Sequence, residues 1–253
     1  MRISTNHTVM TIQAGVVLGA VVFLALASTV FPFLPSPVAV GRAMIALIGR
    51  QDIYGHFALT VYEALFGYGI AAVLGVLTGV GVGASRTLTD MLNPMILALY
   101  SVPKIIFLPL LMIIFGVGLP PKIANAALHA FFPIVLNALV GMREVERVHL
   151  KVARSMSATR WQILRHVFLP SMVLPVFAGL RLGLGLAFMG ALLAELFESK
   201  AGIGYMVHQF YNQALIAEML AIIIVVFCLI LLLNAGMKKI ENSLTRWRRS
   251  WTR

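Results

Sequence analysis

The chain alternates long apolar runs with short polar segments. Residues 64–85, 123–142 and 219–237 contain no Asp, Glu, Lys or Arg. Each run is long enough to cross about 30 Å of hydrocarbon, which takes about 20 helical residues. A core helix of a soluble protein is normally shorter and polar on one face. The pattern therefore predicts an all-α, polytopic membrane bundle with about six spans, at residues 9–31, 57–83, 94–115, 121–142, 171–197 and 214–236.

Glycine and proline add detail to these spans. The third span carries Pro103 and Pro109 around Lys104, so a broken or kinked helix is expected there. The glycine-rich second and fifth spans predict close packing on small-residue surfaces. After the fifth span, the turn-rich residues 199–204 and the polar residues 208–213 predict a short helix and loop.

The composition supports a membrane protein. Hydrophobic residues make up 60% of the 253 residues and charged residues 11%, against about 25% charged in soluble domains. The one cysteine, Cys228, has no partner for an intrachain disulfide and no metal-ligand spacing, and the six histidines are scattered. An integral membrane enzyme would need a cluster of such residues, so we expect no catalytic, cofactor or metal site in this chain. The run at residues 9–31 is too long for a secretory signal and is interpreted as a retained span.

The net charge of +11 reflects topology rather than a nucleic-acid partner, because positive residues in short loops stay on the cytoplasmic side. With six spans, one side of the membrane receives Arg2, Arg86, Arg143, Arg147, Lys151, Arg154, Arg160, Arg165, Lys238, Lys239, Arg246, Arg248, Arg249 and Arg253. The other side receives Arg42, Arg50, Lys122 and Lys200. This asymmetry predicts that both termini are cytoplasmic.

The longest cytoplasmic loop, residues 143–170, predicts two short basic, amphipathic helices that meet near Ser157. In the first helix, cations and apolar residues recur with helical spacing on separate faces. The cations are Arg147, Lys151 and Arg154, and the apolar residues are Val148, Val152 and Met156. In the second, Trp161, Leu164 and Phe168 recur against Arg160 and Arg165.

This loop resembles the signature of the binding-protein-dependent permeases of ATP-binding-cassette (ABC) importers. That signature runs E-A-A, three residues, G, nine residues, I, one residue, L-P. Here Lys151-Val152-Ala153, Ser157, Val167 and Leu169-Pro170 occupy these positions at the same spacing, with Lys and Ser in place of Glu and Gly. Residues 101–118, 179–188, 194–196 and 202–207 also resemble the nitrate, sulfonate and taurine subgroup.

The resemblance implies one permease domain over residues 1–253, in which the loop at 143–170 carries a coupling helix between spans four and five. That helix would dock on a separate ABC ATPase that holds the ATP, since the chain has no Walker-type motif. The implied partners are the ATPase dimer, an extracytoplasmic binding protein and a second permease chain in the bacterial inner membrane. The implied solute is a small organic anion of the sulfonate, taurine or nitrate kind. The implied coupling residues are Arg147, Lys151, Val152, Ala153, Arg154, Met156, Ser157 and Ala158.

Alternatives stay open for individual residues and for the whole chain. The basic loop can lie on anionic lipid without binding a protein. Arg181, inside the fifth span, and Glu63, at the start of the second, fit either a pathway or a structural charge pair. Glu195 and Glu198 fit a contact with the binding protein or solvated helix ends. The competing function is a stand-alone channel or ion-coupled transporter, the second permease chain could be a related one, and aromatic acids and vitamin precursors remain possible solutes.

Overall fold

In the computed structural model, residues 15, 19, 22, 25–31, 33–143, 145 and 147–245 are described, and every regular element among them is a helix. The first predicted span, residues 9–31, and the basic residues 246–253 fall largely or wholly outside this part of the chain. The chain divides into two compact units. One comprises Met1–Gly55 with Met206–Phe227, and the other His56–Tyr205 with Cys228–Arg253.

In the first unit, a helix that the sequence analysis did not predict, α2 (Pro37–Ile48), precedes the start of α3. The hydroxyl of Ser36 accepts a hydrogen bond from the backbone N–H of Ala39 at 3.3 Å, and Pro37 occupies the first turn. Both features favour a helix start. With 12 residues, α2 is apolar but too short to cross a membrane.

Among the described residues, four helices are long and apolar enough to cross a membrane, and they cover the predicted second, fourth, fifth and sixth spans. A fifth span results if the bent pair Arg86–Ser101 and Lys104–Phe115 is counted as one. The four are α3 (Gln51–Gly83), α6 (Leu119–Arg143), the helix Trp161–Phe197, which includes most of α9 (Leu169–Glu198), and α11 (Ile216–Leu244). The turn at 199–202 and α10 (Ile203–Asn212) agree with the predicted short helix between the last two spans.

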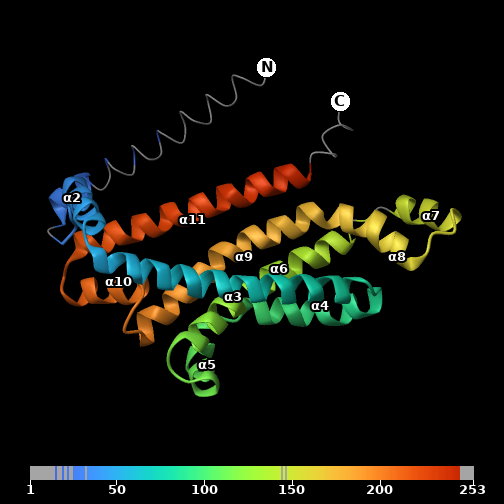
Figure 1. The fold of residues 1–253 in the computed structure, drawn as a ribbon, viewed down its shortest axis with the longest axis horizontal. Helices are drawn as coiled ribbons and strands as arrows, with labels where there is room; N and C mark the ends of the chain where they lie inside the picture. Colours follow the sequence, from blue (N-terminus) through green and yellow to red (C-terminus); the bar gives the residue numbers. More distant parts are fainter. Residues whose placement is uncertain are drawn as a thin grey trace. The chain divides into compact units, whose positions relative to one another are not determined.

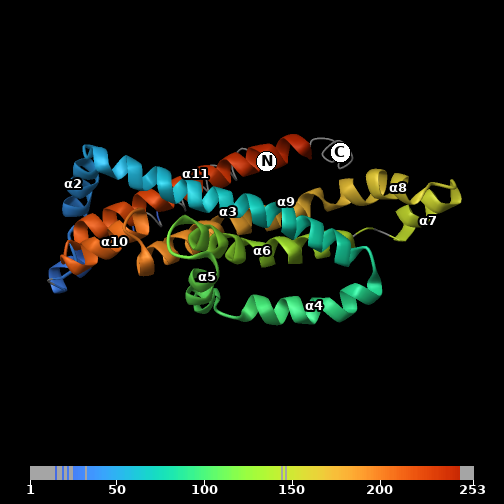
Figure 2. The ribbon, with the colours of Figure 1, turned by 60° about the horizontal axis from the view of Figure 1, so that its bottom comes forward.

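The predicted break in the third span is confirmed. α4 (Arg86–Ser101) ends before Pro103, and the chain bends by 85° into the 3₁₀ helix η1 (Lys104–Phe107) and α5 (Leu108–Phe115). Figures 1 and 2 show α5 turning away from α4. Val102 is extended, as a residue before proline prefers. The expected start at residue 94 is wrong, because the hydroxyl of Ser85 caps α4 nine residues earlier and Pro94 lies inside the helix.

The core of the second unit lies where α3 and α9 pack on α6 (Figure 2). The glycines of α3 and α9 make this possible, as predicted. A Cβ on Gly79 would lie 2.8 Å from the carbonyl oxygen of Val135, and one on Gly190 would lie 2.8 Å from that of Asn125. The same faces bury Ile134 and Phe188 completely. Small residues therefore let the three backbones approach closely, as in other membrane bundles.

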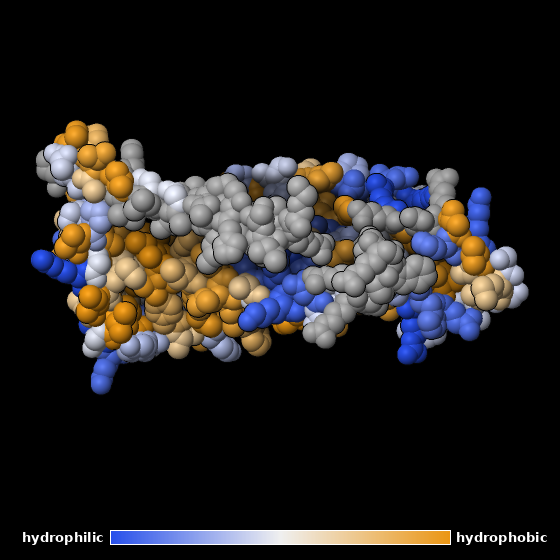
Figure 3. All heavy atoms as spheres, turned by 90° about the horizontal axis from the view of Figure 1, so that it is seen from above, coloured by the Kyte–Doolittle hydropathy of each residue, from blue (hydrophilic) through white to orange (hydrophobic). Residues whose placement is uncertain are grey.

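The loop at residues 143–170 contains α7 (Arg147–Ser155) and α8 (Arg160–Ile163), joined by a turn. The prediction of a separate second helix is wrong, because α8 runs through a π-helical segment, η2 (Leu164–Phe168), directly into α9. Pro170 has no N–H to donate, and the wider π-turn before it lets the helix continue. Figure 3 shows hydrophilic side chains, with some hydrophobic ones among them, at the end of the second unit that carries α7 and α8.

Candidate functional site

Helix α7 exposes its apolar side. Val148, Val152 and Met156 are 63%, 52% and 76% exposed, and their spacing of four residues places them in one row. A surface helix normally turns such a row toward the core. We call these three residues the α7 apolar row. Exposed apolar surface of this kind is typical of a site that contacts another protein or a membrane.

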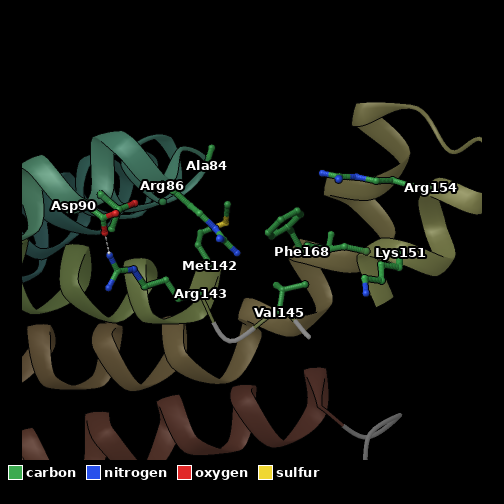
Figure 4. Close-up of a pocket in the computed structure, with 12 residues that line it drawn as sticks. Ala84, Arg86, Asp90, Met142, Arg143, Val145, Lys151, Arg154 and Phe168 are labelled. Atoms are coloured by element: carbon green, nitrogen blue, oxygen red, sulfur yellow. Dashed lines mark hydrogen bonds and ion pairs between the residues drawn. The ribbon is translucent and has the colours of Figure 1, made fainter. Parts of the chain in front are cut away.

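The charged side of α7 faces a cavity of about 780 Å³, drawn in Figure 4. The cavity lies among the end of α3, the start of α4, the end of α6, α7 and the segment before α9. Arg86 and Arg154 extend into it from opposite sides (Figure 4). Its lining includes Arg86, Asp90, Arg143, Lys151, Arg154 and Phe168.

The cavity carries positive charge. Arg143 donates to the Asp90 carboxylate at 3.0 Å, and both side chains are at least half exposed. An exposed pair of this kind contributes at most about 1 kcal/mol of stability. In the part of the chain that the structure describes, Arg86, Lys151 and Arg154 have no ion-pair partner. This end of the unit can therefore receive an acidic surface.

The turn after α7 depends on Ser157, which adopts the left-handed conformation with φ of 57°. Serine thus takes the backbone conformation that the signature glycine would adopt at lower cost. Thr159 then starts α8 with a reciprocal cap: its hydroxyl accepts from the N–H of Gln162 at 3.3 Å, and its own N–H donates to the Gln162 side chain at 2.8 Å. The two features fix where α7 ends and α8 begins.

The structure brings the predicted coupling residues together in one segment. Lys151, Val152, Ala153 and Arg154 lie in α7, and Met156, Ser157 and Ala158 form the turn that follows. Arg147 begins α7, and its side chain lies outside what the structure describes.

A second polar group lies at the opposite end of α6, where the sequence analysis recognised only single charges. Lys122 donates to the Glu63 carboxylate at 3.0 Å and to the hydroxyl of Ser199 at 2.7 Å. The Glu195 carboxylate accepts from the Thr60 hydroxyl at 2.7 Å and from the N–H of Gly204 at 2.7 Å. These contacts join α3, α6, α9, the turn after α9 and the start of α10.

Several expectations for these residues are wrong. Glu195 is 1% exposed, so it is neither a solvated helix end nor a surface contact. Glu63 lies well inside α3 rather than at its start, and Lys122 is 7% exposed rather than part of an exposed loop. The available signal was the pair of opposite charges, Glu63 and Lys122, near the same ends of the predicted second and fourth spans. The side chain of Glu198 lies outside the described part.

Arg181 forms an ion pair with Glu241, which belongs to α11 because that helix continues to Leu244 rather than ending near residue 236. The Nε of Arg181 is buried and finds no hydrogen-bond partner among the described residues. The geometry favours the structural reading of Arg181. Glu63, paired with Lys122, fits the same reading.

Three comparisons with known proteins agree. Residues 71–246 match the family model described as binding-protein-dependent transport system inner membrane component. The chain is 31% identical over 220 residues to the taurine transport system permease protein of Escherichia coli (strain K12), covering 85% of this chain and 80% of that protein. It is 32% identical over 218 residues to a putative aliphatic sulfonates transport permease protein of Bacillus subtilis (strain 168), covering 86% and 79%.

Among solved structures, the chain is similar to one of the MetNI methionine ABC transporter in an inward-facing conformation. The TM-score is 0.63 at 22% identity, with 80% of this chain and 98% of that chain covered. At this identity the similarity establishes the fold.

Proposed function

We propose that this chain forms half of a pathway for a small organic anion. The proposal starts from its family: the chain belongs to the binding-protein-dependent transport system inner membrane components and is a permease subunit of an ABC importer. Members of this family are not themselves ATPases. In the proposal, residues 1–253 form one permease domain, two copies pair in the bacterial inner membrane, and both termini are cytoplasmic. ATP is bound and hydrolysed on a separate ATPase dimer, and an extracytoplasmic binding protein delivers the solute.

The exposed α7 apolar row carries this proposal. An ATPase groove that covers Val148, Val152 and Met156 would bury apolar surface that is exposed in this chain. The coupling segment is then Arg147 to Ala158 within the loop at 143–170. Lys151 and Arg154, on the cavity side, favour an acidic rim around that groove. If the loop bound only anionic lipid, its cations would make the contact, and the left-handed turn at Ser157 would have no function.

Two relatives support the proposed solute class, because their names specify taurine and aliphatic sulfonates. Both solutes carry a sulfonate group. We therefore assign a sulfonate-bearing or similarly small anion to this chain, with the binding protein making the final selection.

The docking experiment compares two valines of equal exposure. Val148 in the α7 apolar row and Val38 in α2 are each 63% exposed. The tagged chain is purified from its native membrane in mild detergent, and co-purifying proteins are identified by mass spectrometry. Val148→Asp should reduce recovery of an ABC ATPase at least roughly tenfold, because it places a charge in the apolar contact. Val38→Asp should leave recovery unchanged.

Two outcomes would overturn the proposal. Normal ATPase recovery with both Val148→Asp and Met156→Asp would show that α7 is not the docking surface. Recovery of the intact wild-type chain without any ATPase would favour a stand-alone transporter instead.

A further inference from the structure

The bend between α4 and α5 places a lysine at a helix break. Lys104 is the first residue of η1, and its ammonium donates to the carbonyl oxygen of Tyr100 at 2.7 Å. It lies 4.6 Å from the centre of the Tyr100 ring and 5.4 Å from that of Phe132 on α6. Aromatic faces attract a cation without neutralising it. The ammonium is therefore held in place by one hydrogen bond and two ring contacts.

The contact with Phe132 gives the depth of this ammonium. At a rise of 1.5 Å per residue, Phe132 is about 20 Å from Leu119 and about 17 Å from Arg143, the two ends of α6. Lys104 therefore lies near the middle of a span, where hydrocarbon would surround a lipid-facing side chain.

Lys104 lacks the partner that other cations inside the spans have. Lys122 pairs with Glu63 and Arg181 with Glu241, whereas the described residues offer Lys104 no carboxylate. Its side chain is partly exposed. An unpaired ammonium facing lipid at this depth costs several kcal/mol. The exposed side must therefore face water or protein.

We propose that Lys104 is the residue that selects for anions inside the translocation pathway, an inference that rests on the proposed function. Irregular backbone at membrane depth is tolerated where it is buried in protein or lines a water-filled cavity, and broken helices form solute sites in other transporters. An ammonium has three N–H donors. Tyr100 uses one well, and the carbonyl of Val102 is a weak second acceptor at 3.5 Å. A donor is left for an oxygen of a sulfonate or similar oxyanion.

The competing role for Lys104 is purely structural. Its bond to the Tyr100 carbonyl satisfies an acceptor at the end of α4, where a positive charge is also favourable. This role predicts a change in stability when Lys104 is replaced, but no preference for negative over positive molecules nearby. The two roles are separable by a charge-selective measurement.

The experiment uses a cysteine reporter at Ser101, the last residue of α4, three residues before Lys104. Ser101 is exposed and small, and the one native cysteine, Cys228, is also exposed, so the reporter Ser101→Cys is made together with Cys228→Ser. The assembled importer in membranes is treated with sulfonatoethyl methanethiosulfonate, which is anionic, or with the trimethylammonium analogue, which is cationic. The rates are measured without nucleotide and in an ATP-trapped state.

With Lys104 present, the ratio of anionic to cationic labelling rates should exceed that of Lys104→Gln roughly tenfold in at least one state, because a nearby unit charge attracts one reagent and repels the other. Lys104→Arg should keep most of the ratio. Equal ratios for Lys104 and Lys104→Gln would overturn the proposal in favour of the structural role. So would labelling by neutral N-ethylmaleimide but by neither charged reagent, since that indicates a lipid-facing site. Recovery of the ATPase with these variants shows that the proposed function stands whichever result is obtained.

Discussion

Removing the ammonium of Lys122 tests the buried polar group most directly. Lys122→Met keeps a long apolar stem but leaves the Glu63 carboxylate without its 3.0 Å partner and Ser199 without its donor. Glu63 is fully buried and Glu195 is 1% exposed, so water cannot replace the lost charge cheaply. Breaking one side of a buried ion pair typically costs about 3–5 kcal/mol.

The expected loss is large enough to measure by thermal unfolding of the detergent-purified chain. With a shift of roughly 2–4 °C per kcal/mol for a chain of this size, the midpoint should fall by roughly 10 °C. Glu63→Gln combined with Lys122→Met should recover most of the loss, because it removes the unpaired charge. Arg50→Met is the matched control. It breaks the 2.6 Å ion pair between Arg50 and Asp52, and both of these side chains are about half exposed. Exposed pairs contribute less than about 1 kcal/mol, so this variant should melt within a few degrees of the parent.

The reasoning fails if Lys122→Met unfolds at the same temperature as Arg50→Met. It also fails if the double variant is no more stable than Lys122→Met alone, since the cost would then come from lost packing rather than from an isolated carboxylate.

Three further predictions concern backbone positions. Ser157→Gly should stabilise the turn after α7 by about 0.5 kcal/mol, measured by slower hydrogen exchange there, because relief of about 1–2 kcal/mol in the left-handed region exceeds the added unfolded-state entropy. Gly79→Leu should abolish recovery of folded chain in size-exclusion profiles, because its side chain would meet the carbonyl of Val135; Gly81→Leu, with open space around it, should be recovered normally. Gly202→Ala should cost at least about 1 kcal/mol in thermal unfolding, since φ is 109° there.

The sequence predicts the parts of this fold that depend on short-range chemistry. The apolar runs have the length of a membrane crossing, so α3, α6, α9 and α11 follow from them directly. The break before Lys104 follows from Pro103, which affects its immediate neighbours. Helix starts are harder to predict, because the cap at Ser85 offers a start that competes with Pro94.

Contacts between distant segments are less accessible from one sequence. Glu63, Lys122 and Glu195 meet only because α3, α6 and α9 pack with a particular rotation and offset. A shift of one residue turns a helix side chain by about 100° and would separate them. The sequence also does not predict that the α7 apolar row is exposed, because helical spacing shows that the row exists but not which way it faces.

The connectivity of the second unit restricts how a movement at α7 can reach the rest of the permease. After the turn at Ser157, the capped start at Thr159 leads into one continuous helix, Trp161–Phe197. Near its other end, Glu195 binds Thr60 of α3 and the N–H of Gly204. A helix of 37 residues is about 55 Å long, so it can pass on tilt or rotation as a rigid body over the whole thickness of the membrane. Its irregular points are the π-helical segment Leu164–Phe168, next to the cavity beside α7, and Pro175 inside α9. In the proposed function, a pull by an ATPase on the α7 apolar row acts on α9 through the π-helical segment, because that segment is the direct connection between α8 and α9.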